Sequence, residues 1–376
     1  MRDVLPELTA IWRTGSTAGV ATVVRMFGSA PRSVGAVMVV APDGKVAGSI
    51  SGGCVEAAVY ELVTEVVRTG TPKLQRFGAD ADDLLVAGLT CGGEIDIFAE
   101  PISQTVFPQL QTVANCIFAE RPVGVATVVA HPDASWLGRR LIVTPGSVDG
   151  SLGSARADAA VSHDVRGLLA VGSTGIVNYG LDGERNEFGM EVFVASHLPR
   201  PRMIIFGAND FAAALAKQGA LLGYRVTVCD ARPVFATGAR FRTVDEVVVD
   251  WPHRYLTTQA EQRLLDGRTV VCVLTHDAKF DVPVLQRALR LGELGYVGAM
   301  GSRRTHQDRI AQLRAAGLTD AELRGLASPI GLDLGACTPA ETAVSIAAEI
   351  IARRCGGGGR PLTDIDCGIH HDDEAP

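Results

Sequence analysis

The sequence has no excess of positive charge and no long apolar run, and both shortages limit what the protein can be. With 35 Lys and Arg against 42 Asp and Glu, the formal net charge is −7, which argues against nucleic acid as the main partner. No stretch approaches the roughly 18 consecutive apolar residues that cross a bilayer, and no basic start precedes an apolar segment. We therefore expect a cytoplasmic protein without a membrane span.

Closely spaced cysteine pairs are also missing. The eight cysteines show no C-x-x-C spacing, so reduced thiols are favoured over a disulfide framework or a zinc knuckle. Cys116, Cys229 and Cys272 lie in apolar segments and are expected in hydrophobic cores. At 376 residues, 47% of them hydrophobic, the chain is long enough for two or three soluble domains.

An internal repeat organises the first half of the chain. GVATVV at 19–24 recurs at 124–129, and GSISGGCVEAA at 48–58 aligns with GSLGSARADAA at 150–160. GEIDIFAE at 93–100 similarly resembles MEVFVAS at 190–196. The pattern predicts two degenerate copies of one α/β unit, residues 1–100 and 101–198, packed as one pseudo-symmetric domain, residues 1–198.

A different pattern starts after HLPRPR at 197–202. Apolar strands alternate with helices from MIIF at 203–206 to a last helix at 338–354, which predicts a Rossmann-like parallel sheet over residues 199–356. The fold class is therefore α/β, with an N-terminal α/β domain built from two degenerate repeats. Residues 357–376 are glycine-rich and acidic, and they are expected to form a mobile tail.

The loop after the first Rossmann strand gives a mixed signal. Gly207 opens GANDFA, in which Asn209 replaces the glycine that lets a pyrophosphate approach the backbone. Asp230 nevertheless follows at the distance expected for an acid that holds a ribose hydroxyl. Two interpretations remain open: a site for a nucleotide-like ligand, or a scaffold whose dinucleotide site has drifted. Arg232 could bind phosphate, but pairing with Asp230 is favoured.

Two glycine-flanked thiols in the first repeat are candidates for chemistry. SGGC places Cys54 in the first turn of a helix expected at 55–68, where the helix dipole favours the thiolate and the amides of Gly52 and Gly53 could hold an anion. Cys91 in LTCGG could face the same ligand, such as a soft metal centre or a transferable sulfur. The alternative for Cys54 is a small buried core residue. The second repeat carries Arg156 at the position of Cys54, so the first repeat is the better candidate.

Arginines mark two possible anion sites. Arg32 lies in the rigid loop GSAPRSVGA and could bind phosphate or carboxylate, or be an ordinary surface residue. Ser302, Arg303 and Arg304 in GAMGSRRT lie where a strand gives way to a helix, which is a common place for a phosphate. His276 and Asp277 end another strand and suit either acid–base work or a capped turn.

Several longer strings together resemble the XdhC/CoxI family of xanthine dehydrogenase accessory proteins. They are GSAPRSVGAVMVV, GSISGGCVE, LTCGGEIDIFAEP, IIFGAND, VTVCDARPVFA, LTHDAKFDVPVL, YVGAMGSRRT and SPIGLDLGACTPAE. The resemblance spans nearly the whole chain. It implies a homodimeric chaperone rather than an enzyme, which binds the molybdenum cofactor and protects it while a cysteine desulfurase supplies its terminal sulfur. Delivery would be to an apo molybdenum hydroxylase of the xanthine dehydrogenase or carbon monoxide dehydrogenase type.

The resemblance also assigns roles to the candidate residues. A molybdopterin phosphate would be held by Arg32, the SGGC loop or the GSRR segment, and molybdenum could contact Cys54 or Cys91. Two positions depart from the family: GANDFA stands where relatives usually read GAGHVA, and Cys337 replaces a basic residue. Binding of NAD(P) or another nucleotide is therefore doubtful. The rival functions are an NAD(P)-dependent oxidoreductase, based on the Rossmann pattern alone, and a molybdopterin nucleotidyltransferase, whose Gly-rich N-terminal motif is missing.

Overall fold

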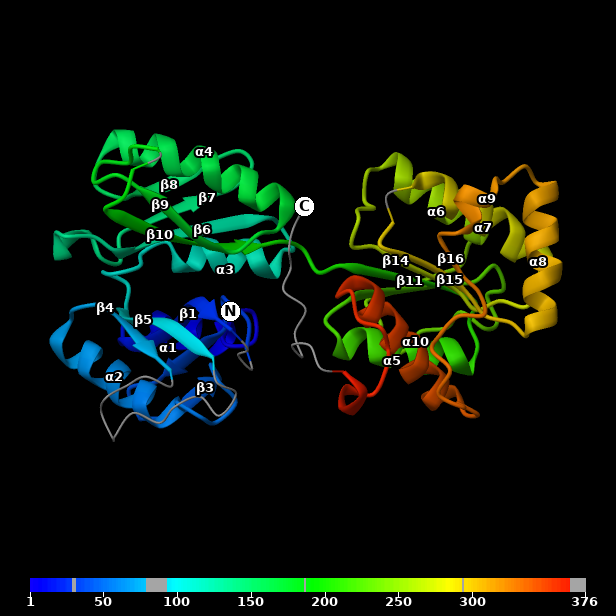
Figure 1. Ribbon diagram of the computed structural model, residues 1–376, viewed down its shortest axis with the longest axis horizontal. Helices are drawn as coiled ribbons and strands as arrows, with labels where there is room; N and C mark the ends of the chain where they lie inside the picture. Colours follow the sequence, from blue (N-terminus) through cyan, green and yellow to red (C-terminus); the bar gives the residue numbers. More distant parts are fainter. Residues whose placement is uncertain (29–31, 79–92, 186, 293, 366–376) are drawn as a thin grey trace. The chain divides into compact units, whose positions relative to one another are not determined.

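The computed structural model describes residues 1–28, 32–78, 93–185, 187–292 and 294–365. The chain divides into two compact units, Met1–Pro199 and Arg200–Pro376 (Figure 1). We call them the first and the second unit, and each is described by itself.

The first repeat of the first unit builds an antiparallel sheet in the order β3-β2-β1-β5-β4. Valine and isoleucine dominate its central strands, as expected for pleated surfaces that are buried on both faces. Helix α2 ends where Gly70 adopts a positive φ of 73°, a conformation that glycine takes without steric cost. The elements are α1 (Leu5–Arg13), β1 (Ala18–Phe27), β2 (Val37–Val40), β3 (Val46–Gly48), α2 (Glu56–Thr69), β4 (Lys73–Phe77) and β5 (Glu94–Ile102).

The second repeat builds a sheet of the same topology, β8-β7-β6-β10-β9. The two GVATVV segments fall on the central strands β1 and β6, so the predicted duplication is confirmed. The elements are α3 (Leu110–Phe118), β6 (Val123–Ala130), β7 (Arg140–Val143), β8 (Val148–Ser151), α4 (Ala155–Val171), β9 (Gly175–Tyr179) and β10 (Met190–His197).

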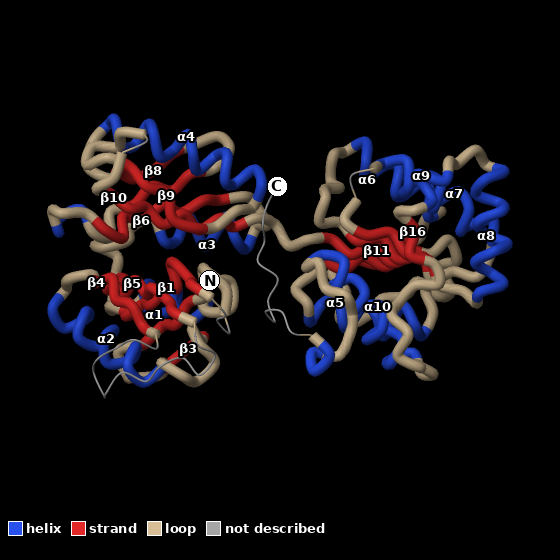
Figure 2. The backbone as a smooth tube through the Cα atoms, in the orientation of Figure 1, coloured by secondary structure: helices blue, strands red, loops and turns tan. Residues whose placement is uncertain are grey.

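Each sheet of the first unit is covered on one face by its own helix, α2 or α4, and its other face lies toward the sister sheet (Figure 2). The glycine that opens GVATVV explains the close helix packing. A Cβ at Gly19 would lie 2.2 Å from Cγ1 of Val63 on α2, and one at Gly124 would lie 2.5 Å from Cγ1 of Val165 on α4. Both repeats therefore need glycine at this position.

The second unit is a parallel sheet in the order β13-β12-β11-β14-β15-β16. Helices α5 and α10 pack on one face, and α6, α7 and α8 pack on the other. The order reverses between β11 and β14, which is where ligands bind in open sheets of this kind. The elements are β11 (Arg202–Phe206), α5 (Asp210–Leu221), β12 (Arg225–Cys229), β13 (Glu246–Val248), α6 (Pro252–Glu261), β14 (Val270–Val273), α7 (Ala278–Leu291), β15 (Tyr296–Ala299), α8 (Arg303–Ala315), α9 (Asp320–Leu323), β16 (Leu326–Ala327) and α10 (Pro339–Arg354).

Several local expectations are confirmed. Thr338 and Glu341 form the capping box of α10. Cys116, Cys229 and Cys272 are buried in hydrophobic clusters. Within the described ranges, the helices are too short or too polar to cross a membrane. The tail expected at 357–376 falls largely outside those ranges, which end at residue 365.

A buried ion pair holds the carboxyl ends of β14, β15 and β16 together. Arg309 Nη2 donates to Asp281 Oδ2 at 2.9 Å and to the Met300 carbonyl at 2.7 Å, while Nη1 donates to Ser328 Oγ at 3.1 Å. Thr275 donates its hydroxyl to the other oxygen of Asp281. The two charged side chains are 3% and 5% exposed. If one of them were removed, water could therefore not reach the other to solvate its charge.

Replacing Arg309 with methionine should strongly destabilise this part of the second unit, because Asp281 would remain buried without its counter-charge. We expect a loss of about 3–5 kcal/mol, measured as faster hydrogen–deuterium exchange in peptides from β14 and β15. Arg314→Met is the control, because its pair with Asp320 is 59% and 72% exposed and should contribute about 0–1 kcal/mol. Equal, small effects of the two substitutions would contradict the role given to the buried pair.

Candidate functional site

The loop between β3 and α2, residues 49–55, brings several predicted residues together. Arg32 donates from Nε to the carbonyl of Ser49 at 3.4 Å, so this exposed arginine lies beside the segment that carries Gly52, Gly53 and Cys54. Gly52 and Gly53 are exposed, and Cys54 is half-buried against the core of the first repeat. Arginine and thiol thus belong to one surface region of the first repeat.

Glu56 takes the place that we had expected for an external anion. Its Oε2 accepts from the Gly53 amide at 2.8 Å, and its Oε1 accepts from the Ser51 amide at 2.9 Å and from Ser49 Oγ at 2.8 Å. The Gly52 amide donates to Ser49 Oγ at 3.2 Å. The expectation that the amides of Gly52 and Gly53 are free to bind an anion is therefore wrong.

The expected position of Cys54 also needs correction. Helix α2 begins at Glu56 with Val55 as its N-cap residue, so Cys54 precedes the helix rather than lying in its first turn. The Cys54 amide donates to Ser51 Oγ at 3.0 Å. The thiol is therefore presented by a hydrogen-bonded loop.

Hydrogen bonding fixes the charge of the Glu56 carboxylate. Burial by itself raises the pKa of Glu56, but hydrogen bonds from Ser51 and Ser49 outweigh it and lower the pKa to about 2. The loop next to Cys54 therefore carries a negative charge at every physiological pH.

In the second repeat an acidic residue also accepts hydrogen bonds from the loop before the helix, but this loop has no cysteine. Asp158 accepts from Ser151 Oγ at 2.7 Å and from the Leu152 amide at 2.7 Å, as Glu56 does in the aligned loop. The position aligned with Cys54 is occupied by Arg156, which pairs with Glu184 at 2.9 Å. The acid is therefore a structural feature shared by both repeats, and Cys54 distinguishes the first repeat.

The other predicted thiol cannot be placed, because Cys91 lies outside the described residues. Among the residues that the structure does describe, no group of three or more His, Cys, Asp or Glu is arranged to hold a metal ion. Contact between molybdenum and Cys54 or Cys91 stays a prediction.

In the second unit, Asn209 occupies the crevice at which the strand order reverses. Its Oδ1 accepts from the Ala212 amide at 2.9 Å and caps α5, while its Nδ2 donates to the Leu274 carbonyl at 2.7 Å at the end of β14. Gly207 has a φ of 109°, and a Cβ there would lie 3.0 Å from Thr275. The β11–α5 loop is therefore pinned against β14 where a pyrophosphate would need to enter.

Asp230 is saturated with internal hydrogen bonds. It is 1% exposed and accepts from the Ala208 amide at 2.8 Å and from Arg232 through N at 2.9 Å, Nε at 2.9 Å and Nη2 at 2.8 Å. Burial raises the pKa of Asp230, but hydrogen bonds from Arg232 and Ala208 more than offset it and lower the pKa. The preferred Asp230–Arg232 pairing is confirmed, and four donors fill the four acceptor positions of the carboxylate.

The remaining predicted polar residues lie at the ends of β14 and β15. Ser302 caps α8 by accepting from the Thr305 amide at 3.1 Å, and Arg303 and Arg304 are exposed at the start of that helix. Asp277 caps α7 and pairs with Lys279 at 2.8 Å, which fits the capped-turn alternative. Exposed arginines at a helix start are suited to a phosphate, so this segment remains a candidate.

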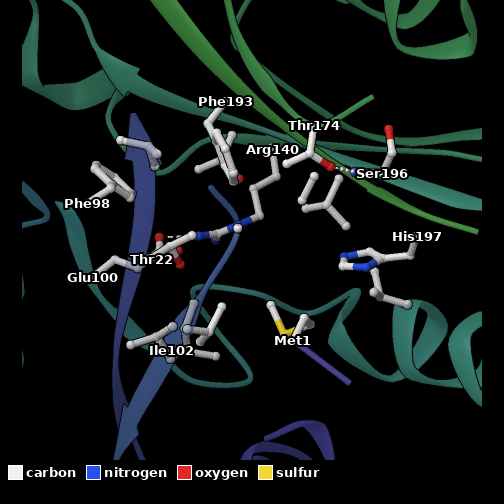
Figure 3. Close-up of a pocket in the computed structure, with 18 of the residues that line it drawn as sticks. Met1, Thr22, Phe98, Glu100, Ile102, Arg140, Thr174, Phe193, Ser196 and His197 are labelled. Carbon is white, nitrogen blue, oxygen red and sulfur yellow. Dashed lines mark hydrogen bonds and ion pairs between the residues drawn. The ribbon is translucent and has the colours of Figure 1, made fainter. Parts of the chain in front are cut away.

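A cavity of about 450 Å³ between the two sheets of the first unit was not anticipated from the sequence. Figure 3 shows Arg140 of β7 directed toward Glu100 of β5, with His197 on another side of the space. Burial and the nearby positive charges lower the pKa of His197 to about 4, so its ring is uncharged at neutral pH. A strongly polar pair inside an apolar cavity is the arrangement typical of small-molecule sites.

Comparisons with known proteins agree with this architecture. The model of the XdhC and CoxI family matches residues 11–78 and 116–180, one segment in each repeat, and the model of the XdhC Rossmann domain matches residues 203–350. The chain belongs to the XdhC/CoxI family.

Relatives in this family match almost the full chain. A Bacillus subtilis protein, described as a probable subunit of xanthine dehydrogenase, is 29% identical over 92% of this chain and 96% of its own length. The "Molybdenum cofactor insertion chaperone PaoD" of Escherichia coli is 26% identical over 94% of this chain and 88% of its own length. A crystal structure from Bacillus halodurans, named a xanthine dehydrogenase, aligns with a TM-score of 0.71 at 23% identity and covers 96% of this chain and 98% of its own, which shows the shared fold.

The Asp230–Arg232 pair can be tested through stability. Arg232→Ala removes two side-chain donors and leaves Asp230 buried, so it should cost about 1.5–3 kcal/mol, measured by pulse proteolysis across a urea series. Arg240→Ala is the matched control, because its partner Asp210 is 80% exposed and the pair should contribute about 0–1 kcal/mol. If Arg232→Ala costs no more than the control, Asp230 is not saturated as described.

Glu56 should restrain the reactivity of Cys54. In Glu56→Gln, loss of the negative charge favours the thiolate and loss of the amide contacts loosens the loop, so alkylation of Cys54 should be roughly two- to tenfold faster. The rate is followed by mass spectrometry of the Cys54 peptide. Asp158→Asn makes the equivalent change in the second repeat and should leave this rate unchanged; a similar acceleration there would mean that general loosening, not the local contacts, controls the thiol.

Proposed function

We propose that this protein is a molybdenum cofactor accessory protein, which binds the cofactor, protects it and delivers it in sulfurated form to a molybdenum hydroxylase. The observation that carries the proposal is the similarity to the PaoD insertion chaperone over 94% of the chain, supported by the matches to both family models. The receiving enzyme would be of the xanthine dehydrogenase or carbon monoxide dehydrogenase type. A cysteine desulfurase would be the second partner, and the protein would work in the cytoplasm as a homodimer.

The region of Arg32 and Cys54 is the proposed place of cofactor contact. Cys54 offers a soft sulfur donor to the molybdenum end of the cargo, and Arg32 offers a guanidinium to its phosphate. Because Glu56 already binds the amides of Ser51 and Gly53, the phosphate must be held by side chains rather than by this loop's backbone. Cys91 remains a second proposed sulfur contact.

The second unit is proposed to serve as a scaffold and docking domain. Asn209 bridges the crevice and Asp230 is saturated by Arg232 and Ala208, so the contacts on which a dinucleotide depends are already used internally. Ser302, Arg303 and Arg304 remain available for a phosphate of the cargo or for acidic groups of a partner. Hydride transfer from NAD(P) is therefore disfavoured as the activity.

Cofactor retention tests the proposal. Purified wild-type protein, loaded with released molybdenum cofactor, should retain it through gel filtration, and Cys54→Ser and Arg32→Ala should each weaken retention about tenfold, as expected for the loss of one strong contact. Molybdenum is measured by elemental analysis and the pterin by fluorescence after oxidation.

The matched controls are Cys355→Ser and Arg156→Ala, which change an exposed cysteine of the second unit and an exposed arginine of the second repeat. Both should retain the cofactor as the wild type does. Failure of folded wild-type protein to retain cofactor would contradict the proposed function, and equal losses in controls and site variants would contradict the proposed location.

A further inference from the structure

The cavity between the two sheets of the first unit lies where the repeats face each other. Most of it is lined by residues at equivalent positions of the two repeats. Strand register identifies the equivalent positions: Thr22 pairs with Phe98 across β1 and β5, and Thr127 pairs with Phe193 across β6 and β10. Both pairs line the cavity, together with the equivalent valines of β1 and β6. Each repeat thus contributes nearly the same wall.

The symmetry is broken at a few positions, and at each of them one repeat replaces an apolar residue with a polar or charged one. Arg140 is equivalent to Val37, because these residues pair with Thr127 and Thr22. Glu100 is equivalent to Ala195, two positions beyond Phe98 and Phe193 along β5 and β10, and His197 is equivalent to Ile102. Since the apolar counterparts pack without difficulty in the same fold, the fold itself does not require the polar residues.

Glu100 and Arg140 form a buried ion pair that leaves atoms unused. Arg140 Nη2 donates to Glu100 Oε2, and the guanidinium stacks over Phe107 at 4.4 Å from the ring centroid. Arg140 is 7% exposed, yet its Nη1 has no hydrogen-bond partner among the described residues, and neither have Ser196 Oγ and His197 Nε2. Among the same residues, no hydrogen bond reaches Glu100 Oε1.

These unused atoms need hydrogen-bond partners, which water or a ligand inside the cavity must supply. A buried donor or acceptor without a partner costs about 1–3 kcal/mol, and three such atoms belong to residues that line the same space. A ligand that supplied their partners would recover this free energy. The cavity volume of about 450 Å³ lies within the range of small-molecule sites.

The charges around the cavity select an uncharged ligand. Arg140 is balanced by Glu100, the lining residues Arg2 and Asp3 contribute one charge of each sign, and His197 is neutral. Met1 also lines the cavity, and burial lowers the pKa of its α-amino group, which disfavours the charged form. An added anion would therefore have no excess positive charge to neutralise it. A neutral cyclic amide, in contrast, has a carbonyl that can accept a hydrogen bond from a guanidinium and an adjacent N–H that can donate one to a carboxylate.

We propose that this cavity binds an uncharged fused-ring heterocycle through its cyclic amide edge, with the carbonyl accepting from Arg140 and the ring N–H donating to Glu100. Two sources share this chemistry: the pterin end of the molybdenum cofactor, and a free purine. The pterin source rests on the proposed function, whereas binding of the heterocycle does not.

Direct binding of isolated heterocycles tests the proposal. Pterin (2-amino-4-oxopteridine) is titrated by its fluorescence and hypoxanthine by calorimetry, against wild-type protein and the double variant Glu100→Ala, Arg140→Val. This variant gives the cavity the residues that the opposite repeat carries and strands no buried charge. Ser196→Ala is a milder second variant that removes one unpartnered atom.

We expect at least one of the two rings to bind wild-type protein and to bind the double variant about tenfold or more weakly, as the loss of two charged contacts requires. The double variant should melt no lower than wild type. The control pair Arg156→Val, Glu184→Ala removes an ion pair of the same unit that is nearer the surface, with side chains 60% and 21% exposed, and should leave binding unchanged. Pterin alone binding would identify the cofactor as the source, and hypoxanthine alone would identify a purine.

Three results would overturn the proposal. They are binding of neither ring by folded wild-type protein, equal binding by the double variant, and tighter binding of an anionic probe such as 1-naphthoate than of its neutral counterpart 1-naphthamide. Because retention of intact cofactor is tested separately at Arg32 and Cys54, failure here and failure of the proposed function are distinguishable.

Discussion

The first unit depends on one constraint: each repeat builds a sheet with two apolar faces, and its longer helix, α2 or α4, covers only one of them. Gly19 and Gly124 allow α2 and α4 to approach their sheets, since any larger residue would collide with Val63 or Val165. The remaining faces are buried against each other and against α1 and α3. Pairing of the copies is therefore necessary for burial, and it creates the cavity between the two sheets.

This packing constraint also limits which positions of the two repeats can carry polar or reactive side chains. Positions that pack under α2 and α4 are fixed as small or branched apolar residues in both repeats, whereas the loops ahead of these helices differ. Glu56 and Asp158 each accept hydrogen bonds from the loop ahead of their helix. The helices begin at different aligned positions, however, so Arg156 lies in the first turn of α4 whereas Cys54 lies in the loop before α2. The same logic applies inside the unit, where Val37 and Ala195 correspond to Arg140 and Glu100.

Much of the architecture could be predicted from the sequence because it depends on short, local residue patterns. The recurrence of GVATVV identified equivalent strands, and the spacing of Thr338 and Glu341 identified the start of α10. Predictions failed where the outcome depended on side chains reaching back along the chain. Glycines in SGGC indicated available amides, but Glu56 folds back on this loop. The three-residue spacing of Gly53 and Glu56 is that of a capping box, and it was the signal that could have predicted this contact.

The cavity could not be predicted for a related reason. Glu100 and Arg140 are 40 residues apart and look like ordinary charged residues near strand ends, so only the strand register shows that they meet. The repeat offered an indirect signal, because a charged residue aligned with an aliphatic one in a buried strand must have a partner or a purpose. Asp230 shows the opposite case, in which a sequence motif indicated a site that is not available. Its position matches that of a ribose-binding acid, but Arg232, two residues later, donates hydrogen bonds to both of its carboxylate oxygens.

The two units therefore use buried charge differently. In the second unit, Asp230 and Asp281 have their oxygens bonded to arginines and other internal donors, and a saturated pair of this kind stabilises a scaffold without presenting anything to a ligand. In the first unit, Arg140 retains an N–H without a partner among the described residues, and Glu100 retains an oxygen. A fold under selection for stability alone gains nothing from such a half-used pair, because apolar residues would pack there at lower cost. Retention of the pair is thus better explained by binding than by stability, and it places small-molecule recognition in the duplicated unit rather than in the Rossmann-like one.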